Sequence, residues 1–158
     1  MKLSELLNTR AIRLRLQARN KREAIAELVA LLENAHGCDS HGEILDRVLR
    51  REEMMTTGIG YGVAIPHGKA RSADHMMAAC AVSPEGLDFD AEDGQPATLF
   101  VLFVSPEHAA TLHVKVLANI SRLLKEESVR RSLREARSPE DFLAAVQNAE
   151  AAFIPSSS

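Results

Sequence analysis

The run Leu99-Phe100-Val101-Leu102-Phe103-Val104 constrains the fold more than any other part of this chain. Valine and phenylalanine favour strands, and a continuous apolar run without polar alternation is typical of a strand buried on both faces. From about Thr111 to Lys125 the apolar residues then recur at the spacing of a helix. A buried strand followed by an amphipathic helix indicates an α/β fold, in which helices cover a central sheet.

Strand and helix patterns alternate in the rest of the chain as well. Strands are expected at residues 11–16, 63–65 and 76–82, and helices around residues 24–32, 40–52 and 128–137. A last helix is expected to begin at Ser138-Pro139, a cap followed by proline in the first turn. We predict one α/β domain over residues 1–153, with a mixed parallel and antiparallel sheet of about five strands flanked by helices on both faces. Residues 154–158 are expected to form a flexible tail.

Charge and cysteine content narrow the possible functions. The formal net charge of −3 and the pI of about 6.1 give no reason to expect binding to nucleic acid or to an anionic membrane. No apolar run approaches the length of a membrane span, and Lys2 and Glu5 interrupt the N-terminus too early for a secretory signal. Cys38 and Cys80 form no CxxC motif and indicate free thiols. We therefore expect a cytoplasmic protein.

The most informative segment for function runs from Thr56 to Lys69. It contains alternate glycines, a short apolar run, and His67 between Pro66 and Gly68. Closely spaced glycines allow the backbone to approach an anion, and proline fixes the backbone just before the histidine. This pattern favours a small oxyanion site that displays one imidazole.

The glycines do not match either common nucleotide motif. A P-loop needs Ser or Thr after Gly-Lys and a further glycine upstream, but these positions hold Ala70 and Val63. Val63 also stands where the dinucleotide fingerprint requires its third glycine. The histidine-rich segment His36-Gly37-Cys38-Asp39-Ser40-His41 lacks a second ligand cluster and is interpreted as a solvated loop, so no metal site is predicted. The same interpretation applies to His75 and His108.

His67 is the strongest candidate for a reactive group. A neutral imidazole is a competent nucleophile, and Arg51 or Lys69 could supply positive charge for an oxyanion. His113 is a candidate second member because it lies at the start of the helix that follows the buried strand, where a helix N-terminus also favours anions. An ordinary surface histidine stays the alternative for each.

Two blocks of the sequence resemble the IIA domain of the fructose–mannitol class in the bacterial phosphotransferase system. The first runs from Arg51 to Ile65-Pro66-His67-Gly68, and the second from His113 to Ile120. The resemblance extends from Leu3 to about Phe153. The motif Thr57-Gly58-Ile59-Gly60-x-Gly62 and the length of the chain resemble those of the nitrogen-regulatory branch of the family.

This resemblance implies a phosphotransferase domain that carries a phosphoryl group on Nε2 of His67. The donor would be the phosphohistidine of a carrier protein, HPr or NPr, charged by an enzyme I that uses phosphoenolpyruvate. A P–N bond is already activated, so no cofactor is implied. The resemblance assigns His67 and His113 as active-site histidines and Arg51, Thr57, Gly58 and Gly68 as phosphate-binding residues.

The chain departs from the family pattern at two positions. Leu112 precedes the second histidine where relatives often have glutamate, so His108, which follows Glu107, is kept as a fallback. Tyr61 stands where asparagine is common. An apolar rim around His67 is expected to bind the partner protein. Its candidate residues are Met54, Met55, Ile59 and Tyr61.

Three functions stay open on this basis. The first is a regulatory phosphocarrier that binds other cytoplasmic proteins according to its phosphorylation state. The second is a sugar-specific transport component that passes its phosphoryl group to a IIB. The third is a sensor domain that binds a free anion without forming a covalent bond.

Overall fold

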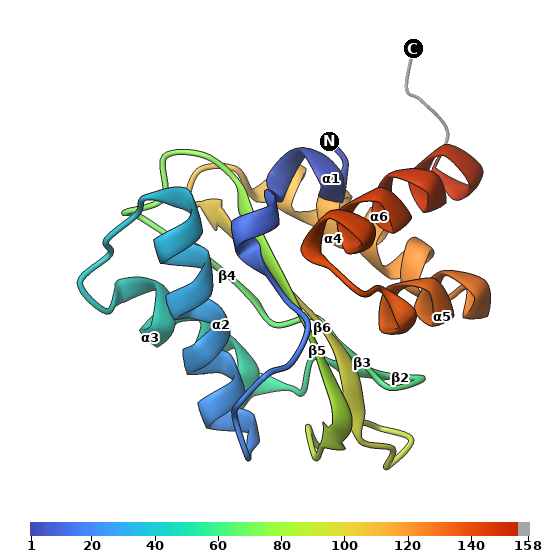
Figure 1. The fold of residues 1–158 in the computed structure, drawn as a ribbon. Helices are drawn as coiled ribbons and strands as arrows, with labels where there is room; N and C mark the ends of the chain where they lie inside the picture. Colours follow the sequence, from blue (N-terminus) through green and yellow to red (C-terminus); the bar gives the residue numbers. More distant parts are fainter. Residues whose placement is uncertain (155–158) are drawn as a thin grey trace.

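The computed structural model describes residues 1–154, which form one α/β unit (Figure 1). The described residues contain six helices and six strands. The strands are β1 (Ile12–Arg13), β2 (Gly58–Gly60), β3 (Val63–Ala64), β4 (His67–Ala70), β5 (Met77–Leu87) and β6 (Ala97–Pro106). The helices are α1 (Leu3–Leu6), α2 (Lys21–His36), α3 (Glu43–Met54), α4 (Ala110–Leu124), α5 (Glu127–Glu135) and α6 (Pro139–Phe153), and a 3₁₀ turn covers Thr9–Ala11.

Strand β6 is the centre of the sheet. On one side β6 pairs with the long antiparallel strand β5, and β1 pairs in parallel with the other side of β5. Along its other edge β6 has two short parallel partners, β3 beside its first half and β4 beside its second half. The predicted mixed sheet is confirmed, and β2, which pairs antiparallel with β3, closes its far edge.

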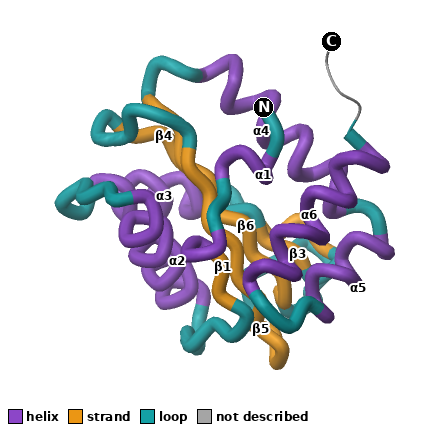
Figure 2. Tube along the Cα trace, turned by 45° about the horizontal axis from the view of Figure 1, so that its top comes forward, coloured by secondary structure: helices purple, strands orange, loops and turns teal. Residues whose placement is uncertain are grey.

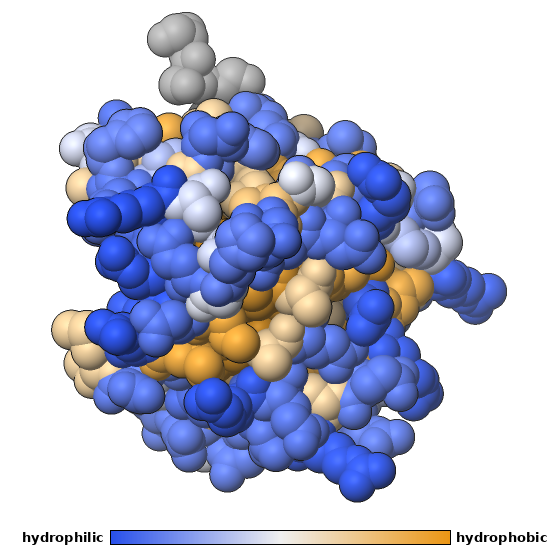
Figure 3. Space-filling model, turned by 90° about the vertical axis from the view of Figure 1, so that its left-hand side faces the viewer, coloured by the Kyte–Doolittle hydropathy of each residue, from blue (hydrophilic) through white to orange (hydrophobic). Residues whose placement is uncertain are grey.

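Helices cover both faces of the sheet, as the sequence predicts. Helices α2 and α3 lie on one side, and α4, α5 and α6 lie on the other (Figures 1 and 2). The side chains of β5 and β6 are buried almost throughout and form the core between these layers. On the side of α2 and α3 the surface is mostly hydrophilic, with apolar residues gathered in its middle (Figure 3).

The strand expected at residues 11–16 is much shorter in the structure. The side chain of Asn8 accepts hydrogen bonds from the N–H groups of Arg10 and Ala11, which draws Ala11 into the 3₁₀ turn. Only Ile12 and Arg13 pair with β5. The alternation of apolar and basic residues persists because Leu16 returns to the core and donates its N–H to Val82.

The start of α3 also differs from the helix expected around residues 40–52. The hydroxyl of Ser40 does accept the N–H of Ile44, but the helix begins only at Glu43, after Gly42 in a left-handed conformation. The carboxylate of Glu43 does not return to Ser40. It accepts the backbone N–H groups of Arg71 and Ser72, just beyond β4, so this glutamate joins α3 to the strand that carries His67.

Two strands were not expected. The glycine-spaced segment contains β2, and His67 begins β4 instead of lying in a loop. Of the predicted tail, Ile154 is buried and donates to Glu150, whereas residues 155–158 lie outside the described residues. No helix within residues 1–154 has both the length and the apolar character needed to cross a membrane.

Candidate active site

Three elements bring four of the six predicted site residues together around a cavity of about 510 Å³. Strand β4 contributes His67, Gly68 and Lys69, and α4 contributes His113. Helix α3 lines the cavity with the side chains of one helical face. The residues of that face are Arg47, Arg50, Arg51 and Met54. Their spacing of three or four residues is the spacing that places side chains on the same side of a helix.

His67 is held in a defined orientation. Its side chain is buried, and its Nδ1 lies 2.8 Å from the carbonyl oxygen of Ile65. Because a carbonyl oxygen only accepts, Nδ1 carries the proton and the neutral ring keeps its lone pair on Nε2. Burial lowers the pKa of His67, and the positive charges of Arg51 and Lys69 lower it further, although Ile65 and Glu52 act in the opposite direction. The neutral, nucleophilic form is therefore favoured.

His113 lies beside His67, as the sequence predicts. The ring centroids are 5.3 Å apart. Nδ1 of His113 lies 2.6 Å from the hydroxyl oxygen of Ser105 in β6. Burial lowers the pKa of His113 to about 4, and the nearby His67, Lys69 and Arg51 lower it as well. Both imidazoles are therefore neutral at pH 7.

Phe103 also belongs to the site, although no sequence motif points to it. Its ring stacks against His67 with centroids 5.2 Å apart and a 20° angle between planes, and it lies 4.6 Å from the ring of His113. Its place follows from the register of the sheet, in which His67 of β4 is the direct partner of Phe103 in β6. The aromatic ring supports both imidazoles, and nothing in the uniform apolar run distinguishes it from its neighbours.

The cations of the cavity wall differ in their partners. Arg47 pairs with Glu43 and Glu107, and Arg50 pairs with Asp46 at 3.0 Å. Within the described residues Arg51 and Lys69 have no carboxylate partner. Arg51 instead donates to the carbonyl oxygen of Met55 at 2.8 Å, which places its guanidinium at the end of α3. These two cations are the ones free to interact with an anion in the cavity.

Paired neutral histidines and unneutralised cations around an open cavity are chemically suited to an anionic group. Comparison with known proteins identifies the family. Residues 5–149 match the family model described as "Phosphoenolpyruvate-dependent sugar phosphotransferase system, EIIA 2". The chain belongs to this EIIA family. It is therefore a phosphotransferase-family domain.

Relatives of two kinds are similar to this EIIA domain. A nitrogen regulatory protein of Bradyrhizobium diazoefficiens is 36% identical over 137 residues, which is 87% of this chain and 89% of that protein. A fructose-specific EIIA component of Haloferax volcanii is 40% identical over 129 residues, which is 80% of this chain and 84% of that protein. The chain spans only 22% of the fructose-specific EIIABC component of Bacillus subtilis, with which it shares 36% identity over 90% of its own length.

Solved structures agree with this assignment. The nitrogen regulatory protein IIA-Ntr of Neisseria meningitidis superposes with a TM-score of 0.84 at 31% identity, covering 90% of this chain and 97% of that one. The complex of IIA and phosphorylated IIB for mannitol from Escherichia coli matches with a TM-score of 0.76 at 23% identity, which supports the fold alone. The nitrogen-regulatory members thus resemble the EIIA domain in both sequence and structure.

Two predicted phosphate-binding residues do not line the cavity of the EIIA domain. The N–H and hydroxyl of Thr57 both donate to the buried carboxylate of Glu52. A Cβ at Gly58 would lie 3.2 Å from atoms of Ala91, so this glycine permits close packing in β2. Gly68 does line the cavity, and a Cβ there would approach Val48 of α3 to 3.2 Å. Thr57 and Gly58 therefore lie outside the cavity lining.

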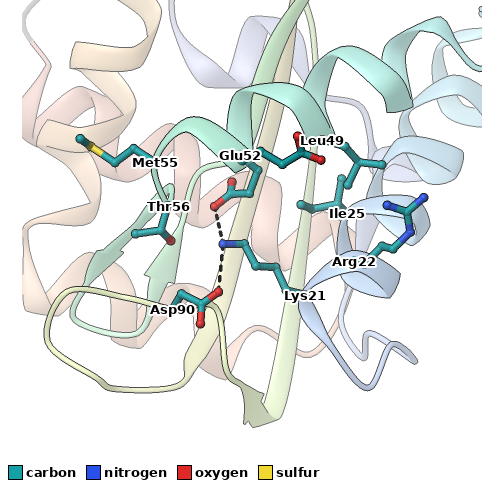
Figure 4. A pocket seen from close by; sticks show the side chains of 9 residues that line it. Lys21, Arg22, Ile25, Leu49, Glu52, Met55, Thr56 and Asp90 are labelled. Atoms are coloured by element: carbon teal, nitrogen blue, oxygen red, sulfur yellow. Dashed lines mark hydrogen bonds and ion pairs between the residues drawn. The ribbon is translucent and has the colours of Figure 1, made fainter.

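Glu52 lines a neighbouring cavity of about 590 Å³ and connects two segments around it (Figure 4). Lys21 at the start of α2 forms ion pairs with Glu52 at 2.8 Å and with Asp90 at 3.4 Å. Glu52 thus bridges α2 and the segment leading to β2. Because this cavity uses the opposite face of α3 from Arg51, it is separate from the histidine site.

The other histidines lie elsewhere. His108, the fallback for His113, lines a separate cavity with Arg71, Asp74 and Glu107. His36 bonds to the carbonyl oxygen of Ala78. Within residues 1–154 no three His, Cys, Asp or Glu side chains lie close enough together to hold a metal ion.

The predicted apolar rim is only partly at the site. Met54 lines the cavity and is 82% exposed, and Val114, directly after His113, is 64% exposed. Met55 lines the neighbouring cavity instead. Ile59 and Tyr61 lie beside the beginning of β6, whereas His67 pairs with Phe103 further along that strand. Of the four predicted rim residues, Met54 therefore lines the cavity, and Val114 follows His113 in α4 outside the cavity lining.

Proposed function

We propose that this protein accepts a phosphoryl group on Nε2 of His67 from the phosphohistidine of an HPr-type or NPr-type carrier, and that its phosphorylation state regulates other proteins. The observation that carries the proposal is the hydrogen bond from Nδ1 of His67 to Ile65. It commits one ring nitrogen to the backbone and leaves the other as the nucleophile beside His113, Arg51 and Lys69. The similarity to nitrogen regulatory proteins supports the regulatory role.

The proposed step exchanges one P–N bond for another. The lone pair on Nε2 of His67 attacks phosphorus, and the electrons of the breaking P–N bond return to the carrier's imidazole. His67 keeps the proton on Nδ1, which the Ile65 carbonyl stabilises as the ring becomes positively polarised. Arg51, Lys69 and His113 are placed to stabilise the charge on the three transferring oxygens. Catalysis rests on positioning and charge.

The surface around the cavity supports docking of a carrier protein. Met54 of α3 lines the cavity, and Val114 of α4 directly follows His113, so each helix offers one exposed apolar side chain. Arg51 and Lys69, the two cations of the cavity without a carboxylate partner in the described residues, add positive charge near Met54. We propose that the carrier contacts Met54 and Val114 while its phosphohistidine enters the cavity, and that this exchange takes place in the cytoplasm.

Phosphoenolpyruvate labelled with ³²P, together with enzyme I and either HPr or NPr, tests the proposal directly. The wild-type protein should gain an acid-labile, base-stable phosphate, and His67→Ala should gain none. His36→Ala, which removes a histidine outside the cavity, is the matched control and should label normally. Labelling that persists in His67→Ala would place the acceptor elsewhere, and a wild-type protein without covalent label would favour an anion sensor.

A second candidate function is favoured by the 40% identity to a fructose-specific EIIA component. In that role the protein would pass its phosphoryl group to a IIB protein. Adding candidate IIB proteins to the labelled protein separates the two functions, because rapid loss of label to one of them contradicts a purely regulatory role.

A further inference from the structure

The hydroxyl of Ser105 is buried behind the active-site histidines. Ser105 lies in β6, directly opposite Lys69 of β4, and its side chain has no exposed area. Its Oγ lies 2.6 Å from Nδ1 of His113. Within residues 1–154 this ring nitrogen is the one hydrogen-bond partner found for the hydroxyl. The two side chains therefore depend on each other for a partner.

The direction of this bond follows from the number of protons. A serine hydroxyl has one hydrogen to donate, and a neutral imidazole has one N–H and one lone pair. If Nδ1–H donated to Ser105, the hydroxyl hydrogen would be buried without an acceptor, which is costly. If Ser105 donates to Nδ1, both the hydroxyl hydrogen and Nδ1 have a partner. In that arrangement His113 carries its proton on Nε2.

The two histidines would then be fixed in opposite tautomers. The Ile65 carbonyl places the proton of His67 on Nδ1 and leaves its Nε2 with a lone pair. Ser105 places the lone pair of His113 on Nδ1 and its N–H on Nε2. One ring is thereby prepared to bind phosphorus, and the other to donate a hydrogen bond to a phosphoryl oxygen. Because burial keeps His113 neutral, the tautomer determines what this ring can do.

We propose that Ser105 is a positioning residue that selects the Nε2–H tautomer of His113, so that His113 donates to the phosphoryl group carried on His67. The proposal rests on the proposed function, since it assigns His113 a role in that transfer. It is specific to the hydroxyl. An alanine at this position would fill nearly the same space but could not donate, and the tautomer of His113 would no longer be fixed by its surroundings.

Imidazole ¹⁵N NMR of protein labelled at histidine provides the direct measurement. Protonated and unprotonated ring nitrogens give well-separated signals, so the tautomer of His113 can be assigned before any phosphate is added. We expect Nε2–H in the wild type and in Ser105→Thr, which keeps the hydroxyl, and a mixture of tautomers in Ser105→Ala. A wild-type His113 with its proton on Nδ1 overturns the proposal, even if Ser105→Ala fails to fold.

Single-turnover transfer from the phosphorylated carrier provides the functional measurement. Ser105→Ala should slow transfer to His67 about tenfold, the effect of losing roughly one oriented hydrogen bond. Ser105→Thr should retain most of the rate. Ser83→Ala, which removes a buried serine from the other end of β5, should leave it unchanged.

The outcomes separate this proposal from the proposed function. A wild-type protein that takes no label on His67 overturns both. A wild type that labels normally, with an alanine variant that keeps both the tautomer and the rate, overturns only the role of Ser105. Equal slowing by Ser83→Ala and Ser105→Ala, with the tautomer of His113 unchanged in both, shows a structural effect and also overturns it.

Discussion

The imidazole of His67 and the carbonyl oxygen of Ile65 are joined by a 2.8 Å hydrogen bond between groups two residues apart in the chain. Because Pro66 lies between them, the backbone that presents the ring also fixes its orientation. The site needs no distant side chain to select the reactive nitrogen of this histidine. His113 differs, since its partner Ser105 comes from β6 and depends on the register of the sheet.

Phosphorylation of His67 should raise the pKa of His113. In the unmodified protein that pKa is lowered to about 4 by burial and by nearby positive charge. A phosphoryl group carries about two negative charges and would lie close to the second ring, whose centroid is 5.3 Å from that of His67. We expect an increase of at least about one pKa unit, which corresponds to roughly 1.4 kcal/mol. NMR titration of the His113 ring with and without phosphate on His67 measures it, and an unchanged pKa would place the phosphate away from His113.

The stability of the protein should fall as the pH is lowered from about 6.5 to about 4. Unfolded histidine has a pKa of about 6.5, whereas that of His113 is about 4 in the folded protein. Between these values the unfolded state binds the proton more readily, so acid favours unfolding. The full loss is on the order of 2–3 kcal/mol. Urea denaturation at several pH values in this range measures the free energy of unfolding. This free energy should fall less steeply with decreasing pH in His113→Gln than in the wild type.

A control variant separates His113 from histidines in general. His41→Gln changes an exposed side chain in the loop before α3. Its free energy of unfolding should depend on pH as steeply as that of the wild type. Glu43, whose pKa is lowered to about 2 by hydrogen bonds from Ser72 and Arg71, acts mainly below this pH range. If the free energy of unfolding depends on pH equally in the wild type and in His113→Gln, the pKa of His113 is not lowered by folding.

The sequence was sufficient to predict the layers of the fold and the two histidines, because both depend on local signals. The apolar run at Leu99, the caps and the spacing of helix residues each act over a few positions. Phe103 and Ser105 could not be found in this way, since their roles come from pairing β4 with β6. For a similar reason the sequence does not show that the hydrogen-bond donors of Thr57 already have a partner. A threonine beside a glycine-rich segment looks available to an anion until the buried Glu52 is seen to bind it.

Arg51 and Arg50 should differ in their effect on phosphoryl transfer although both line the cavity. Arg50 is neutralised by Asp46, whereas Arg51 has no carboxylate partner in the described part of the chain. Arg51→Ala should slow single-turnover labelling about 100- to 1,000-fold, the range for losing one donor to a developing oxyanion. Arg50→Ala should cost less than about threefold. Equal slowing in the two variants would indicate a general loss of positive charge.

Thr57→Val should destabilise the protein without slowing the transfer of phosphate. The substitution removes the hydroxyl that donates to Glu52 and leaves a buried carboxylate oxygen with one partner fewer, at a cost of about 1–3 kcal/mol. Chemical denaturation measures this loss, and single-turnover labelling at a temperature where the variant is folded should stay within about threefold of wild type. In Glu52→Gln, Thr57→Val should cost markedly less, because the partners are coupled. A large loss of rate with unchanged stability would instead return Thr57 to the phosphate, where the sequence alone had placed it.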